Sequence, residues 1–373
     1  YPPLANLLFF FFSRFISPSL AESSFDLRLA LQKDQRAIMI YLLFALLCVV
    51  IFSLILKNYY QQKNSRATAE VLSFLFIFFY PFYYCVERGN ILLLSMIASA
   101  FFVFFHNSPS QKIRELSYVS LAFAAGLKIY PAFFGVLLLV EKKYKAALHA
   151  VLYGLLFFFV PFLFYDFGAS LFQLIDNLLT FSQSNKAVFS FGSTSIMNLF
   201  YYLGDKYHSL GVIAFALSEV IALICAFLAP QKWQRVFALT YLIINIHSVS
   251  STYAAIFLII PFAIFISAET KKQNADWVYL ILFCLLLLPL PCVYYYHRDW
   301  ILAFFEMLNL PYSSAVNKLL AWPCVQFMFL LVALESLMNL IAAKKRGITL
   351  SSFFYKKRKK QTKKPAVTEG STI

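Results

Sequence analysis

The sequence predicts an all-α polytopic membrane protein, and its composition carries this prediction. Hydrophobic residues make up 61% of the 373 residues and aromatic residues 19%, whereas charged residues make up only 13%. The mean hydropathy is +0.72. Soluble domains are about 45–50% apolar and about 25% charged, and a soluble domain of this size has too little interior to hide so much apolar surface. A soluble enzyme, a disordered chain and a disulfide scaffold are therefore excluded.

Apolar runs along the chain mark the expected membrane helices. A helix needs about 20 apolar residues to cross about 30 Å of hydrocarbon. Seven runs are candidates, and we expect each to form one transmembrane helix. They cover residues 37–57, 70–86, 91–106, 145–165, 208–229, 276–295 and 317–342.

Two further apolar stretches, 115–141 and 235–269, have polar residues at their centres and basic residues at both ends. Because basic residues collect on the cytoplasmic side, a single crossing would leave one basic cluster outside. We therefore expect two hairpins, whose arms of about 13 residues rise only about 20 Å. Their tips then lie below the outer membrane surface, where irregular backbone is tolerated only beside a protein-walled or watery cavity. The sequence thus predicts an outward-facing cavity at the tips.

These elements give about eleven passes, with the present N-terminus outside and the C-terminus in the cytoplasm. We expect one transmembrane domain over 1–342, with outer segments 1–36, 166–207 and 296–316. Residues 3–12 are apolar but too few to span, which predicts an interfacial or re-entrant helix. The basic-inside pattern fits a plasma membrane.

The segment 343–373 is strongly basic. It holds ten of the 32 Lys and Arg residues and one acid, and so contributes +9 of the net charge of +15. We expect a disordered cytoplasmic tail that contacts anionic lipids. The charge therefore does not indicate nucleic acid, and no nucleic-acid partner is expected.

Glu87, Arg88 and Asn90 lie in a short polar link between two predicted spans. One interpretation is a charged pair and an amide that face the cavity. The alternative is a polar turn with a helix cap, because Asn is a good cap and Gly89 a good turn residue.

Lys128 lies at the expected tip of the first hairpin, followed by Tyr130 and Pro131. An ionisable residue at membrane depth is costly and is by default a functional candidate. The alternative is a lysine that extends to the interface. The submerged tip favours a functional role.

His247 and Tyr253 bracket a run of Ser and Thr at the second tip. This run is either a polar patch that contacts sugar or phosphate, or a set of hydroxyls that bond back to helix carbonyls. Arg88, Lys128 and His247 together would suit an anionic ligand, and phosphate on a lipid is the natural one beside a bilayer. The sequence contains no pattern typical of a zinc site, a P-loop or a dinucleotide fingerprint, so no metal or cofactor is expected.

Other polar residues inside or beside the spans have open roles. Glu219 and Glu335 fall within predicted spans. Each either has a functional role, paired with Lys or His or in a proton path, or faces another helix and stays neutral. Four further histidines are expected singly at the membrane interface, namely His106, His149, His208 and His297.

Several motifs in order resemble a known family. The chain carries Tyr1-Pro2-Pro3-Leu4-Ala5, Arg88-Gly89-Asn90, Lys128-Ile129-Tyr130-Pro131 and Lys142-Lys143-Tyr144-Lys145, with weaker matches at 193–198 and 247–253. Over most of 1–270 this series is similar to glycosyltransferase family 87, the polyprenyl-phosphate-dependent mannosyltransferase-like proteins of the GT-C class. The resemblance implies a GT-C-like bundle, with about twelve passes in the intact protein.

The resemblance also implies where the catalytic base lies. In that family the Tyr-Pro-Pro element follows a first transmembrane helix and a large outer loop that carries the acidic residue expected to act as general base. Both would precede Tyr1, so we expect a chain truncated at its N-terminus. After His247 the chain has Ser and Thr where the family leads us to expect Trp or a second His. This departure leaves the sugar and the acceptor open.

The activity that the resemblance implies is transfer of a hexose, with mannose expected, from a polyprenyl-phosphate donor to an envelope glycolipid or glycan on the outer face. A carboxylate takes the proton of the acceptor hydroxyl, which attacks the anomeric carbon with inversion. Cationic groups stabilise the charge on the departing phosphate. We assign donor phosphate and substrate binding to Arg88, Asn90, Lys128, Tyr130, His247, Tyr253 and Glu87.

Two other classes of protein remain as alternatives. A lipid-linked sugar transporter or flippase, or an envelope polysaccharide polymerase, would share the outward cavity and its basic residues. Transporters tend to carry inverted repeats, and no convincing repeat is visible in this sequence. A non-catalytic assembly subunit predicts no charge at the hairpin tips, and Lys128 argues against it.

Overall fold

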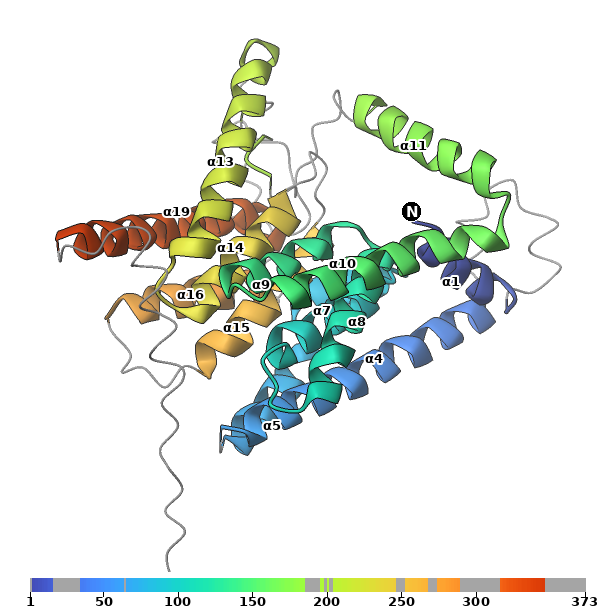
Figure 1. The fold of residues 1–373 in the computed structure, drawn as a ribbon, viewed down its shortest axis with the longest axis horizontal. Coiled ribbons are helices and arrows are strands. Elements are labelled where there is room, and N and C mark those ends of the chain that lie inside the picture. The colour runs from blue at the N-terminus through green and yellow to red at the C-terminus, as the bar shows by residue number, and fades with distance from the viewer. Residues whose placement is uncertain are drawn as a thin grey trace, which may run out of the picture.

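A computed structural model gives the fold, which is built from helices. Within the part of the chain that it describes, every regular element is an α-helix or a 3-10 helix (Figure 1). The described residues are 2–15, 34–63, 65–184, 195–197, 200, 204–245, 252–267, 274–288 and 316–345. The all-α prediction is confirmed for these residues.

Four described helices are long and apolar enough to cross a membrane. They are α4 (Gln35–Gln61), α10 (Tyr144–Phe159) with its 3-10 continuation η2 (Val160–Phe164), α13 (His208–Leu228), and residues Pro323–Lys345 of α19 (Val316–Lys345). Many of their large apolar side chains are exposed, which suits contact with lipid. They correspond to the predicted spans 37–57, 145–165, 208–229 and 317–342.

The predicted span 70–86 is a broken helix. Its two parts, α5 (Arg66–Phe76) and α6 (Tyr80–Glu87), are bent by 44° and pass the same test only as a pair. Pro81 stands at the start of α6. It has no N–H to donate to residue 77, so a continuous helix could not have kept its hydrogen bonds there.

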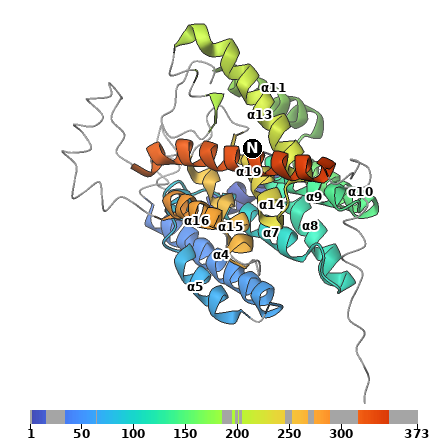
Figure 2. The same cartoon turned by 90° about the vertical axis from the view of Figure 1, so that its left-hand side faces the viewer.

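The prediction of about eleven passes is not confirmed, because the described chain offers four spans, or five with the bent pair. Two of the apolar helices are short and enclosed by protein. Nearly all residues of α7 (Leu92–Phe105) and α14 (Lys232–Asn245) are buried. A helix that is apolar all round, as α7 is, can be a core helix, and the 14 residues of either helix rise only about 21 Å. Figures 1 and 2 show both among the other helices.

The first predicted hairpin is present as two arms. The outgoing arm is α8 (Gln111–Leu127), and the return arm is η1 (Tyr130–Gly135) followed by α9 (Val136–Val140). A Cβ on Gly135 would lie 3.5 Å from Leu121 Cδ2, so the return arm packs against α8. Pro131 ends the outgoing helix because it has no N–H for the carbonyl of Leu127.

The second hairpin also folds back on itself. Its arms are α14 and the pair formed by η5 (Thr252–Leu258) and α15 (Ile259–Ile266). The Trp233 ring, at the start of α14, lies 5.1 Å from the Phe265 ring, at the end of α15. The start of one arm therefore meets the end of the other. The tip between them, with His247, lies outside the described residues.

The basic ends of the two hairpins meet at one end of the molecule. Lys63 Nζ, just after α4, donates to Ser267 Oγ at 2.9 Å, next to the end of α15. Lys232 Nζ, at the start of α14, donates to the carbonyl of Val103 at 3.1 Å, near the end of α7. We call this region the basic end.

The first predicted outer segment contains a short helix. The expected interfacial helix at 3–12 is α1 (Pro3–Ser13), which is too short to span. Its Pro3 and Ala5 are buried. The expectation of a short helix there is confirmed.

The remaining predicted outer segments are only partly described. The start of the predicted outer segment 166–207 forms helix α11 (Phe167–Ser184), whose Phe172, Ile175 and Leu179 form an exposed apolar stripe at helical spacing. The apolar run 276–295 begins as α16 (Asn274–Leu287). The outer segment 296–316 lies outside the described residues except for its last residue, which begins α19. That helix runs to Lys345, and the rest of the predicted tail also lies outside the described residues.

Candidate functional site

Segments far apart in the sequence meet beside the tip of the first hairpin. Ala5 of α1, Ile91 at the start of α7 and Leu127 at the end of α8 form one buried apolar cluster. Gly126 packs so closely that a Cβ there would lie 3.0 Å from Leu4 Cδ2. The first residues of α1, the 87–91 link and the Lys128 break are therefore neighbours. Three of the motif series that the sequence singled out converge here.

The link after α6 is a Schellman motif. Asn90 N donates to the Cys85 carbonyl at 3.0 Å and Gly89 N to the Val86 carbonyl at 3.1 Å. Gly89 has φ +57°, the left-handed conformation that this motif requires and that glycine adopts without strain. The local sequence thus fixes a sharp end to α6 and presents Arg88 on the turn.

Asn90 is buried and its side-chain Oδ1 accepts from the backbone N–H of Leu92 at 3.0 Å, at the start of α7. This contact is the helix cap that one of the two sequence interpretations predicted for Asn90, at the start of α7. Glu87 and Arg88 are both exposed, and no ion pair joins them within the described chain. The two side chains therefore do not form an ion pair with each other, and their role in facing a cavity stays a prediction.

Arg88 instead lies against Tyr84, four residues earlier on α6. Its Nη2 donates to the Tyr84 hydroxyl at 3.2 Å, and its Cζ is 5.2 Å from the centre of the Tyr84 ring. The Tyr84 ring stacks at 6.2 Å on Tyr253 and at 6.1 Å on Tyr80. Tyr253 therefore belongs to the same aromatic wall as the Arg88 turn, and it comes from the second hairpin.

Lys128 is half-buried and ends α8 in an extended conformation, with φ −146° and ψ 129°. It lies close enough to the Cys85 thiol for an electrostatic interaction. Cys85 Sγ in turn donates to the Tyr253 carbonyl at 3.6 Å. Tyr130, two residues after Lys128, meets Phe257 of the second hairpin edge to face at 6.0 Å. The two hairpins therefore touch near their tips.

Five of the seven assigned residues thus lie in one region, which we call the tip site and define as Arg88, Asn90, Lys128, Tyr130 and Tyr253. Glu87 lies on its exposed rim. His247 falls outside the described residues, so its place in this site stays a prediction, as does the outward-facing cavity.

Tyr41 and Tyr84 hold the tip site together, although the sequence did not mark them as functional residues. The Tyr41 hydroxyl lies 3.1 Å from the carbonyls of both Cys85 and Asn90, and so fastens the turn to α4. Nothing in the apolar pattern of α4 marks Tyr41. Tyr84 could have been found, because it lies one helical turn before Arg88.

The tip site combines one guanidinium and one ammonium with stacked tyrosine rings. Arg offers planar donors that match phosphate oxygens, and Lys offers a compact charge. Rigid elements hold both: a Schellman turn presents Arg88, and Lys128 stands where proline ends a helix. Such a site can bind an anionic phosphate next to the membrane.

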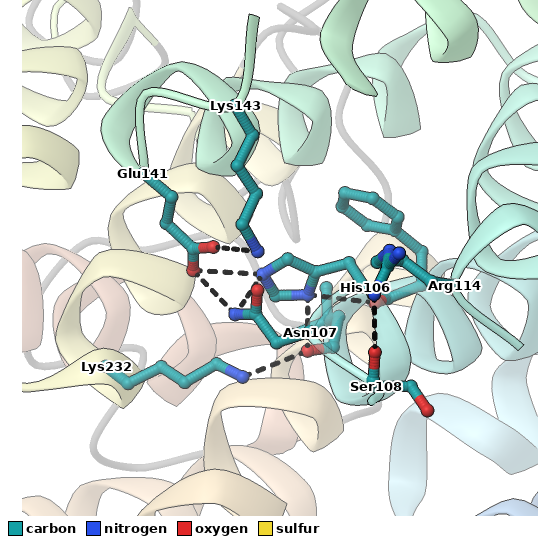
Figure 3. A network of polar contacts seen from close by, with 9 residues as sticks. His106, Asn107, Ser108, Arg114, Glu141, Lys143 and Lys232 are labelled. Carbon is teal, nitrogen blue, oxygen red and sulfur yellow. Dashed lines mark hydrogen bonds and ion pairs between the residues drawn. The ribbon is translucent and has the colours of Figure 1, made fainter. Parts of the chain in front are cut away.

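A second polar network lies at the basic end (Figure 3). His106, expected at the interface, is fully buried. Its Nε2 lies 3.0 Å from Glu141 Oε1, and its Nδ1 lies 3.1 Å from the carbonyls of Phe102 and Val103. Glu141 Oε2 also pairs with Lys143 Nζ at 3.0 Å. The expectation that His106 stands alone is therefore wrong, because this histidine ties α7 to the turn before α10, whereas its place at the membrane interface stays a prediction.

The charges of this network act on Glu141. Burial alone would raise the pKa of the Glu141 carboxyl. The hydrogen bond with His106 and the ammonium of Lys143 outweigh burial and hold the pKa below its usual range. Glu141 is therefore a stable carboxylate at neutral pH.

Glu219 and Glu335 both face other helices, as one of the two alternatives predicted. Asn245 Nδ2 donates to Glu219 Oε1 at 2.6 Å. The Tyr279 hydroxyl donates to Glu335 Oε1 at 2.8 Å, and the amide of Gln234 donates to the other oxygen. No Lys or His pairs with either carboxylate within the described chain, so both join helices through neutral donors.

Comparison with protein families gives one match to the chain. The sequence model of glycosyltransferase family 87 covers residues 1–289. Comparisons with curated proteins and with solved structures gave no match. The family match spans α1, the tip site and both hairpins, and it extends over more than half of the chain. The chain therefore belongs to glycosyltransferase family 87, a family of membrane glycosyltransferases.

Proposed function

We propose that this protein transfers mannose from a polyprenyl-phosphate donor to an envelope glycolipid or glycan on the outer face of the plasma membrane. One observation carries the proposal: the tip site gathers Arg88, Lys128 and Tyr253 from three segments that all lie within the family match. A cationic site at the junction of two apolar hairpins suits a ligand with a charged phosphate and a lipid chain.

In this proposal Lys128 and Arg88 bind the donor phosphate, and His247 joins them from the second tip. Tyr130, Tyr253, Asn90 and Glu87 contact the sugar or the acceptor. The position of Tyr130, Tyr253 and Asn90 in the tip site supports these assigned roles.

The reaction is a direct displacement. A carboxylate, which is not among the residues assigned here, takes the proton from the acceptor hydroxyl. The hydroxyl oxygen forms a bond to the anomeric carbon while the bond from that carbon to the phosphate oxygen breaks. The configuration inverts, and the lipid phosphate departs with its charge stabilised by Lys128, Arg88 and His247.

The test uses the intact protein reconstituted in liposomes with labelled polyprenyl-phosphate-mannose and a mixture of envelope glycolipids. Transfer of the label to a new lipid or glycan supports the proposal, and the product identifies the acceptor. A donor that stays intact and changes leaflet would instead indicate a flippase. A donor left untouched, while a different polyprenyl-phosphate sugar is consumed, would contradict the choice of mannose.

A further inference from the structure

A hollow of about 430 Å³ lies at the basic end, between the start of α8 and the start of α10. Its walls include Asn107, Arg114, Tyr118, Lys142, Lys143 and Lys145. Arg114 and Lys128 lie on or at the end of the same helix, about 20 Å apart along its axis. The hollow is therefore separate from the tip site and needs its own explanation.

Positive charge dominates this hollow. Two carboxylates lie near it, and both are already engaged: Glu141 by His106, Asn107 and Lys143, and Glu115 by His149 of α10 at 3.4 Å. Lys142 and Lys145 form no ion pair with any described carboxylate. Arg114 donates from Nη1 to the Ser108 carbonyl at 3.1 Å, which leaves its other donors available.

Tyr118 adds a neutral donor to the hollow. Its side chain is 2% exposed, and its ring meets Phe102 at 6.4 Å. The hydroxyl makes no hydrogen bond to any residue in the described ranges. Because Tyr118 lines the hollow, its hydroxyl is a donor that a ligand in the hollow can engage.

Lys142, in the wall of the hollow, has a strained backbone conformation. The turn after α9 is a Schellman motif, in which Lys143 N donates to the Leu138 carbonyl at 2.7 Å and Lys142 N to the Leu139 carbonyl at 2.9 Å. Lys142 occupies its left-handed position with φ 58°, where Gly89 stands in the other Schellman motif. It is the one non-glycine residue with positive φ among those described. A lysine at a position that favours glycine places an ammonium at the hollow despite this strain.

We propose that this hollow binds a phosphate-bearing anion, either the headgroup of an anionic phospholipid or a free phosphate. Arg and Lys side chains with a tyrosine hydroxyl provide charge-assisted donors for phosphate oxygens. Helix α10 begins at the hollow, and none of its residues is buried. Its exposed Leu148, Leu152 and Leu155 offer an apolar surface for the chains of a lipid whose headgroup fills the hollow.

Native mass spectrometry of the full chain, purified in mixed phosphatidylglycerol and phosphatidylcholine, tests the proposal. The pocket variant Lys142→Gly/Lys145→Ala removes two charges and relieves the strain at Lys142. A matched variant, Lys57→Ala/Lys344→Ala, removes two exposed lysines outside the hollow. We expect the wild type to retain phosphatidylglycerol selectively. The pocket variant should weaken this retention on the order of 20-fold, and the matched variant should leave it within about twofold.

A second arm identifies the source of the phosphate. Inorganic phosphate is titrated against each protein in phosphatidylcholine nanodiscs while the melting temperature is recorded. A rise for the wild type but not for the pocket variant, without selective phosphatidylglycerol retention, assigns the hollow to a soluble phosphate. The proposal is overturned if neither probe distinguishes wild type from pocket variant, or if the matched variant loses as much binding as the pocket variant. A melting temperature of the pocket variant without ligand that equals or exceeds that of the wild type shows that its fold is intact.

Discussion

Lys128 lies where the first hairpin turns back. In the proposed mechanism its ammonium group stabilises the negative charge on the departing phosphate. We expect Lys128→Ala to lower the rate of sugar transfer about 100-fold or more, since removing one preformed electrostatic contact to a transition state has effects of this size. Lys128→Arg should retain part of the activity because it keeps the charge. The control is Lys57→Ala, an exposed lysine on α4. Turnover of Lys128→Ala within a few-fold of the wild type would show that Lys128 does not have this role.

Gly89 and Lys142 occupy the same position in two Schellman motifs. Substitutions at these two positions should therefore change the free energy of unfolding in opposite directions. Gly89 has open space around it, so Gly89→Ala costs only the left-handed strain of φ +57°. We expect a loss of about 1–2 kcal/mol in the free energy of unfolding. Lys142→Gly relieves the same strain and should stabilise the protein by about 1 kcal/mol. Melting temperatures of both variants measure this, and changes of the same sign would refute it.

At the scale of elements, the tip site depends on how α1 docks against α8 and α10. A Cβ on Gly126 would lie 3.0 Å from both Leu4 Cδ2 and Phe157 Cβ, and 3.2 Å from the Phe157 carbonyl oxygen. Since the backbone oxygen cannot move aside cheaply, Gly126→Ala should push these helices apart and cost about 1–3 kcal/mol.

Gly154 in α10 is the matched control for this substitution. It has no heavy atom within 4 Å of a Cβ position, so Gly154→Ala should be neutral or stabilise the helix. Thermal unfolding compares the two variants. Equal melting temperatures for Gly126→Ala and Gly154→Ala would mean that α1 does not pack on α8 as described.

The His106–Glu141 contact joins α7 to the end of the first hairpin, and its effect depends on pH. A carboxyl whose pKa falls on folding stabilises the fold fully above its unfolded pKa of about 4.3, and this contribution disappears as the pH falls through the folded pKa. Glu141 is such a group. The melting temperature of Glu141→Gln should therefore lie below that of the wild type by a constant amount from about pH 7.5 to 5.5. The gap should narrow below about pH 4, and a gap that widened in acid would contradict this account.

At the scale of the whole molecule, the sequence was informative wherever charge or proline interrupts apolar runs. Basic flanks and Pro131 predicted the first hairpin, and Gly89 with Asn90 predicted a capped turn as one of two alternatives. The tertiary contacts of the tip site were not predictable in this way. Tyr41 is one polar hydroxyl on a long apolar helix, and only packing of α4 against the turn reveals its two carbonyl partners.

The number of membrane passes could not be predicted reliably from the sequence. Hydropathy does not separate a helix that is buried in protein from one that is surrounded by lipid, because both exclude water. Thus α7 and α14 read as membrane segments although protein encloses them. Likewise His106 was expected to stand alone at the interface, although its partner Glu141 lies 35 positions away in the sequence.

In the proposed function, the tip site binds the phosphate of the sugar donor. This binding is tested most directly by photo-crosslinking, with a polyprenyl-phosphate-mannose analogue that carries the photoreactive group next to its phosphate, in liposomes with the intact protein. We predict crosslinks in peptides that contain Arg88, Lys128 and Tyr253, and we expect excess unlabelled donor to suppress them. Suppressible crosslinks confined to α13 and α19, or to the hollow at Lys142 and Lys145, would contradict the claim.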